Sequence, residues 1–197
     1  MTSFYTTLVE CLQSRDTSGF YFPVGTLEPS HSGFDRFLQC WFAQALRAMG
    51  EPRLAGTAAP ADRDAYRFLW MRSFDRPVAV RAERRRRRLT LTARMLAGRA
   101  GYDHGALALT RRRWLTEEDW DELDRLIEAA RFWSLPAVSE REGLDGATWV
   151  LEGARAGRHH VVHRWSPEVD GDDAGLRATC VYLLGLSELG AAAGRTY

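Results

Sequence analysis

Apolar residues recur at helical spacing in two stretches near the start of the chain. The first stretch predicts a helix over residues 4–13. The second predicts a longer helix over residues 34–49, with Ser32 as its N-cap and the Gly50–Pro52 segment as its stop. Residues 53–64 (RLAGTAAPADRD) are small, polar or helix-breaking, and they indicate a linker.

After this linker the apolar period changes from helical to two, which is typical of strands. The YRFLWMRSF stretch is so apolar that it predicts a strand buried on both faces. The strands predicted by this period begin at residues 66, 77, 89 and 107. The GARAGR segment then predicts a hairpin turn between two further strands, at residues 149–152 and 160–165.

Two more helices follow from capping and apolar spacing. Thr116 stands before three acids in a first turn, where the helix dipole favours negative charge, and an apolar stripe runs on to Trp133. A C-terminal helix is predicted from about Leu176 to Leu189, after the acidic stretch 170–173. Strands in runs, rather than alternating with helices, predict an α+β fold.

The predicted architecture is an antiparallel sheet of about six strands with helices packed on one face, preceded by an N-terminal helical portion. The predicted organisation is a helical portion at 1–52, a linker at 53–64 and an α+β domain at 65–197. A single compact domain that includes the N-terminal portion is the alternative, because 197 residues suffice for one sizeable core.

Charge is distributed unevenly although the whole chain carries only +1. Residues 66–115 carry 14 Arg and 3 acids, whereas residues 116–197 carry 8 Arg and 16 acids. One hypothesis is internal compensation, in which the basic strands lie beside the acidic helix that starts at residue 117. The other is a charged surface that selects a macromolecular partner.

Two arginine runs and a neighbouring tryptophan are the candidate partner-binding residues. Five adjacent like charges cannot be buried without partners, so the first run is expected at a solvated hairpin tip. Trp114 is expected near this basic surface, with a cation–π stack inside the chain as the favoured interpretation. The candidates are Arg84, Arg85, Arg86, Arg87, Arg88, Arg111, Arg112, Arg113 and Trp114.

Candidate catalytic residues are few. Glu152 and His160 are the weak candidates for an acid–base pair, because they fall on neighbouring predicted strands. His159 and His163 share a strand face but stand about 13 Å apart at about 3.3 Å per residue, and His160 faces the other way. The sequence therefore predicts no metal site, and no cofactor.

Missing and scarce residues exclude several classes of protein. The chain has no lysine, which excludes a lysine Schiff base and the lysine of a phosphate-binding P-loop. Its three cysteines lie on apolar stripes without close spacing, so they are interpreted as buried hydrophobes in a reducing cytoplasm. The N-terminus lacks the pattern of a secretory signal, and no window has the about 20 apolar residues of a membrane span.

Several strings together resemble a set of uncharacterised bacterial proteins of similar length with no assigned activity. The strings are LRAMGEPRL, YRFLWMRSF, FWSLP, LDGATWVLEG and HHVVHRWSP, and the resemblance covers residues 41–189. This chain departs from the set at His159 and His163. The resemblance implies a folded domain and assigns no chemistry.

The functional hypothesis is a non-catalytic binding protein, resembling immunity or adaptor proteins, that recognises another protein through its charged surface and does not contact membranes. Two alternatives belong to other classes. One is a small hydrolase or transferase that uses Glu152 and His160. The other is an accessory protein that contacts nucleic acid through the arginine runs, although no aromatic stacking platform interleaves with them.

Overall fold

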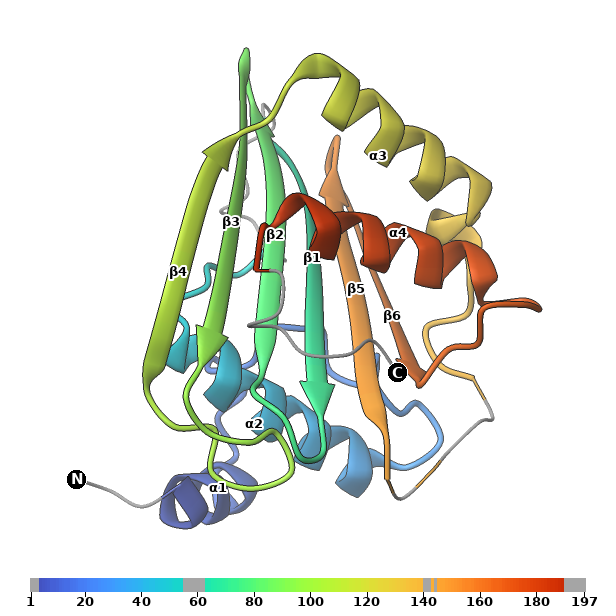
Figure 1. Cartoon of the computed structure of the whole chain (residues 1–197). Coiled ribbons are helices and arrows are strands. Elements are labelled where there is room, and N and C mark those ends of the chain that lie inside the picture. Colours follow the sequence, from blue (N-terminus) through green and yellow to red (C-terminus); the bar gives the residue numbers. More distant parts are fainter. Residues whose placement is uncertain (1–3, 55–62, 140–142, 144, 190–197) are drawn as a thin grey trace.

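The computed structural model describes residues 4–54, 63–139, 143 and 145–189. Two helices come first, then four strands, a helix, a 3-10 turn, a hairpin and a last helix (Figure 1). In chain order the elements are α1 (Phe4–Gln13), α2 (Ser32–Ala48), β1 (Arg63–Arg72), β2 (Val78–Arg85), β3 (Arg88–Leu96), β4 (Leu107–Trp114), α3 (Glu117–Ala129), η1 (Phe132–Ser134), β5 (Ala147–Arg155), β6 (Arg158–Trp165) and α4 (Ala174–Leu186).

The strands form one six-stranded sheet in the order β4-β3-β2-β1-β5-β6. Every neighbouring pair is antiparallel. β1 lies inside the sheet between β2 and β5, which is why its sequence is apolar on both faces. The predicted α+β class and six-stranded antiparallel sheet are therefore confirmed.

α3 and α4 cover one face of the sheet, where they lie side by side in Figure 1. Their apolar residues, including Trp120 and Leu183, pack on Phe68, Trp70 and Trp149 of the strands. The sequence predicts that these two helices pack on one face of the sheet, as they do. Tyr66, Phe68 and Trp70 of YRFLWMRSF therefore contribute to the largest apolar cluster, whereas Phe74 is exposed.

α2 packs on the opposite face, behind the lower part of the sheet in Figure 1. Phe42 and Leu46 of α2 join one apolar cluster with Leu69 and Met71 of β1 and Val150 of β5. Because α2 and the strands share this core, α2 lies against the sheet. Of the predicted linker, residues 55–62 lie outside the described residues, and β1 begins at Arg63, inside the predicted linker range.

Several predicted boundaries hold and others move. α1 spans the predicted range, and the Thr116 side chain caps α3 in a capping box with Asp119. α2 begins at Ser32, but its N-cap is His31. α3 stops at Ala129, before the predicted end at Trp133, because Arg131 takes a left-handed conformation with φ 50°.

The β5–β6 hairpin is tighter than GARAGR suggests. Arg155 and Arg158 close the ladder, so only Ala156 and Gly157 form the turn. Both have positive φ, 49° and 76°, as a two-residue primed turn requires.

Among the helices of the described ranges, none has the length and apolarity needed to cross a bilayer.

Candidate functional site

The nine candidate partner-binding residues gather at one end of the sheet and are called the basic rim here. They comprise Arg84–Arg88, Arg111–Arg113 and Trp114. The β2–β3 ladder closes at the Arg85–Arg88 pair, with Arg86 at φ 56° in the tip, as the sequence predicts. Trp114, the last residue of β4, pairs with Thr90 of β3, so it lies close to this tip.

Part of the basic rim is neutralised by acids of neighbouring elements. Arg84 lies 3.4 Å from Glu117, and its guanidinium stands 4.7 Å from the centroid of the Trp120 ring. Arg113 contacts Asp119 at 3.1 Å and Glu188 at 3.2 Å. For these two arginines the structure supports the hypothesis of internal compensation by α3.

The remainder of the basic rim faces solvent. Within the described ranges no ion pair involves Arg85, Arg87, Arg88, Arg111 or Arg112, and all five are exposed. Trp114 is 67 % exposed. Arginines do stack on tryptophans in the described part of the chain, but on other rings, which belong to Trp70, Trp120, Trp133 and Trp149. The favoured stack on Trp114 is thus not formed.

The edge strand β4 carries Arg111, Arg112 and Trp114 of this exposed part, and the other exposed arginines lie at the β2–β3 hairpin. The Leu115 amide donates to the Leu89 carbonyl at 3.0 Å, and bonded and non-bonded pairs alternate along an antiparallel ladder. Leu91 and Arg113 are therefore a bonded pair. The backbone N–H and C=O groups of Arg112 and Trp114 point away from β3, toward the open side of β4.

The other edge of the sheet is better covered. The His163 amide of β6 donates to the Ala137 carbonyl at 2.6 Å. The Arg164 guanidinium donates to the Pro136 carbonyl at 2.9 Å and pairs with Asp173 at 2.7 Å. The segment before β5 thus occupies the outer side of β6, and β4 is the more accessible edge.

The two candidate catalytic residues lie on opposite faces of the sheet. Glu152 is 1 % exposed and accepts from Arg67, and its Oε1 lies 2.9 Å from His159 Nε2. The His160 ring instead packs on Phe132, with 5.2 Å between centroids, and its Nε2 lies 2.9 Å from the Leu135 carbonyl. Burial lowers the pKa of His160. The structure therefore does not bring Glu152 and His160 together.

The remaining strand histidine follows the predicted alternation. His163 stands on the α2 face, where its ring meets Phe42 edge-on at 5.9 Å. Burial lowers the pKa of His163 to about 4, so the ring is neutral at pH 7. No three side chains of metal-ligating type converge within the described ranges.

A buried ion-pair network lies on the α2 face of the sheet, and the sequence analysis does not predict it. Glu51, just after α2, is 4 % exposed and receives Arg81 Nε at 2.9 Å and Arg94 Nη1 at 2.8 Å. Arg67 Nη1 lies 3.6 Å from the same carboxylate, and its Nη2 pairs with Glu152. Charges from four strands are thus linked through one loop residue.

This network also anchors the end of α2. Arg94 donates to the Gly50 carbonyl at 2.7 Å and Arg67 to the Pro52 carbonyl at 2.6 Å. Cations at a helix C-terminus offset its negative dipole. A buried charge needs a partner, so Arg67 inside the apolar YRFLWMRSF stretch is the one sequence signal that points to this network.

A second feature missed by the sequence reasoning is a groove of about 640 Å³ at the end of the sheet away from the basic rim. Its floor contains Met71, Thr148 and His163 of β1, β5 and β6. One wall is an aromatic face of α2 with residues of α1, and the other consists of loop residues. The aromatic lining residues are Phe4, Tyr5, Phe34, Phe37, Trp41, Phe74, Tyr102 and Trp165.

The aromatic wall of α2 is a row of neighbouring rings. Phe34 and Phe37 lie parallel, with centroids 6.0 Å apart, and the Trp41 ring lies 5.6 Å from Phe37 and is tilted by 39° to it. The Trp41 indole N–H donates to the Ala100 carbonyl at 3.0 Å, which fixes the ring against the β3–β4 loop. The spacing of these three residues predicts a helix stripe, but not that part of it lines a groove.

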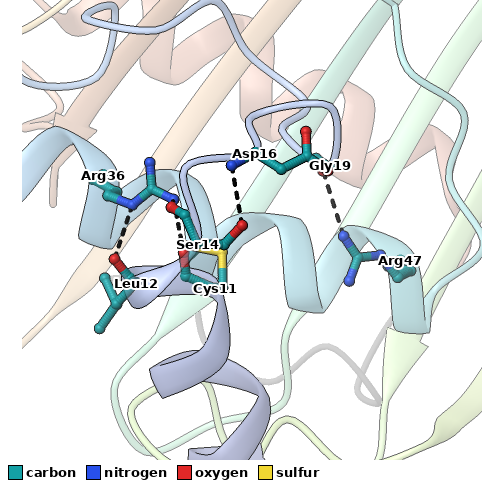
Figure 2. Close-up of a disulfide and its surroundings, with 8 residues drawn as sticks. Cys11, Leu12, Ser14, Asp16, Gly19, Arg36 and Arg47 are labelled. Atoms are coloured by element: carbon teal, nitrogen blue, oxygen red, sulfur yellow. Dashed lines mark hydrogen bonds between the residues drawn. A yellow bond between two sulfur atoms is a disulfide. The ribbon is translucent and has the colours of Figure 1, made fainter.

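The helix α1, which lines the groove with Phe4, Tyr5 and Leu8, is joined to α2 by a disulfide between Cys11 and Cys40 (Figure 2). This bond corrects the interpretation of these two cysteines as unpaired hydrophobes, whereas Cys180 is free and buried as expected. Arg36 of α2 donates to the Leu12 carbonyl at 3.1 Å and to the Cys11 carbonyl at 2.8 Å. No α1 side chain in the described range is fully buried, so these links hold the helix.

Comparison with known proteins adds no family. No protein family and no curated protein matches this chain. The resemblance to uncharacterised bacterial proteins stays a prediction.

Proposed function

We propose that this protein is a non-catalytic binding protein that takes up an extended acidic segment of a partner protein along β4. The open side of β4 carries the proposal. A strand added there would bond to the outward N–H and C=O of Arg112 and to the outward N–H of Trp114, whose carbonyl already accepts from Arg113 Nε at 3.3 Å. The exposed arginines would pair with its carboxylates, and the exposed Trp114 ring would supply apolar contact area.

The arginine side chain suits this role because its planar fork pairs with a carboxylate through two hydrogen bonds. Arg84 and Arg113 already have acidic partners inside the chain, and they position the rim rather than bind. The remaining exposed arginines concentrate positive charge at one end of a molecule of net charge +1. Such a charge distribution raises association rate and selectivity more than affinity.

The alternatives have weaker support in the structure. Glu152 is neutralised by Arg67 and lies on the opposite face from His160, which removes the geometric basis for an acid–base pair.

The expectation of a cytoplasmic location stays a prediction. The Cys11–Cys40 disulfide counts against it, because disulfides persist mainly in oxidising compartments.

The test uses a fluorescent peptide of alternating glutamate and valine residues with blocked ends. We expect saturable binding that weakens at least about tenfold in a variant with Arg85→Ser, Arg87→Ser and Arg112→Ser. The matched control carries Arg15→Ser, Arg99→Ser and Arg131→Ser, which removes the same charge from other exposed sites. Equal weakening in both variants would reduce the proposal to non-specific charge attraction and refute it.

A second arm separates protein from nucleic acid. The intact chain is used to capture partners from an extract, with and without nuclease. A protein retained after nuclease treatment and lost in the clustered variant agrees with the proposal. Capture that disappears with nuclease, with affinity falling steeply as salt rises, would reassign the rim to nucleic acid.

A further inference from the structure

The aromatic groove is independent of the proposed function, because it lies at the opposite end of the strands from the basic rim. Arg63, which pairs with Arg85, begins β1, whereas Met71 in the groove floor lies near its end. The groove volume of about 640 Å³ is in the range of sites that enclose small molecules. Its rings are accessible, since Phe34 is 42 % exposed, Phe74 51 % and Tyr102 49 %.

The charge of the groove is opposite to that of the chain's most basic region. The protein has 27 arginines, but none is among the described residues that line the groove. Among the described lining residues, the charged ones are two carboxylates, Glu28 and Asp145. One Glu28 oxygen, Oε1, accepts from the Ser30 amide at 3.2 Å and from the Ser30 hydroxyl.

His163 adds no positive charge to the groove at neutral pH. Burial holds the pKa of its imidazole at about 4, and Phe42 packs against the ring. Arg164, which follows it in β6, points to the other side of the strand, where it pairs with Asp173. The field inside the groove is therefore set by carboxylates and by the negative faces of aromatic rings.

We infer that this groove binds a small amphipathic organic cation, with an ammonium group among the rings and carboxylates and an apolar body along the α2 wall. Ring faces attract a cation within about 6 Å of their centroids, most strongly when it is desolvated. The exposed rings of Phe34, Phe74 and Tyr102 in the groove lining offer such faces. Glu28 and Asp145 supply the countercharge.

The experiment compares three probes of similar size by calorimetry on the intact chain. The probes are benzyltrimethylammonium, neutral benzyl alcohol and anionic benzyl sulfonate. We expect the cation to bind at least about tenfold more tightly than the other two. Absence of saturable cation binding at millimolar concentration, or equal binding of the neutral probe or the anion, would overturn the inference.

Two sets of variants locate the binding. Glu28→Gln with Asp145→Asn keeps the shape of the groove, and it should reduce cation affinity about tenfold while leaving benzyl alcohol binding unchanged. The control, Glu118→Gln with Asp121→Asn, removes two exposed charges of α3 and should change neither. Phe34→Leu removes a partly exposed ring and should weaken the cation more than the alcohol. Unchanged cation binding in the first variant would overturn the inference.

Discussion

Glu51 is the residue on which the buried charges of the α2 face depend. Its carboxylate is completely buried and faces guanidinium groups from β1, β2 and β3. Removing one partner of a buried ion pair leaves uncompensated charge in a medium of low dielectric constant. Glu51 lies in a loop, outside any strand, so strand periodicity does not predict that it is buried or that it pairs with arginines.

We predict that Glu51→Gln lowers the free energy of unfolding by about 3–5 kcal/mol. Arg94 loses its carboxylate partner, and Arg67 and Arg81 each lose one of two. Urea unfolding followed by tryptophan fluorescence measures the change. The control is Glu117→Gln, because the Glu117 side chain is 69 % exposed and its pair with Arg84 should contribute less than about 1 kcal/mol. Similar losses in the two variants would show that the buried network contributes no more to the free energy of unfolding than an exposed ion pair does.

His104 predicts a loss of stability in acid. Burial lowers its pKa to about 4, and its Nε2 lies 3.2 Å from the Ala100 carbonyl. The unfolded chain, with an ordinary histidine pKa, binds a proton first as pH falls. The contribution of His104 is therefore complete above about pH 6.5 and is lost between about pH 6.5 and 4, to a maximum of about 3 kcal/mol.

The measurement compares unfolding free energies at pH 7 and pH 4.5 for the natural chain and for His104→Gln. The variant should lose less stability between these two pH values, whatever its absolute stability. Carboxylates contribute equally to both proteins and cancel in the comparison. Identical pH dependence would show that His104 titrates normally in the folded state.

At the scale of elements, the alternating ladder of β4 predicts a contrast between adjacent proline substitutions. Arg112→Pro removes an N–H that points away from β3, whereas Arg113→Pro removes one that faces Leu91 in a bonded pair. We expect Arg113→Pro to lower the unfolding free energy by at least about 2 kcal/mol more. A larger loss for Arg112→Pro in thermal or urea unfolding would place the ladder in the other phase, and equal losses would contradict the predicted contrast.

The disulfide predicts a separate behaviour for α1. It joins residues 29 positions apart, and such a link stabilises a chain by about 3–4 kcal/mol in a loop-entropy account. Because α1 buries no residue completely, we expect reduction to raise hydrogen exchange of the α1 amides much more than exchange in β1. Cys180→Ser is the control and should leave α1 protection unchanged. Equal loss of protection in β1 would mean that the link supports the whole fold.

The elements that sequence reasoning predicted are those with local signals. The capping residues around Thr116 and the alternation through β3 needed only neighbouring residues to be recognised. The predicted end of α3 is too late because Arg131 adopts a left-handed conformation. Such a conformation is usually predicted from glycine, and Arg131 is not a glycine. The Cys11–Cys40 pair was missed because its spacing carries no information on how α1 crosses α2.

At the scale of the whole molecule, candidate sites were predictable only where charge is contiguous in sequence. The Arg84–Arg88 run marks a hairpin tip because it cannot be buried. The aromatic groove combines residues from α1, α2, three strands and several loops, so only the tertiary fold assembles it. The same holds for Glu152, whose partner in the fold is Arg67 rather than His160.

The concentration of arginine in the middle of the chain predicts how stability responds to salt. Residues 66–115 carry 14 Arg and 3 acids, and the exposed members of the rim repel one another. The clustered variant with Arg85→Ser, Arg87→Ser and Arg112→Ser should therefore be as stable as the natural chain or up to about 1 kcal/mol more stable at low salt. This difference should vanish near 1 M salt, where the Debye length is about 3 Å.

The dispersed Arg15, Arg99 and Arg131 variant should show no such gain. If the clustered variant proves less stable than the dispersed one, the rim arginines contribute to the fold, and loss of partner binding on their substitution would no longer identify a binding surface.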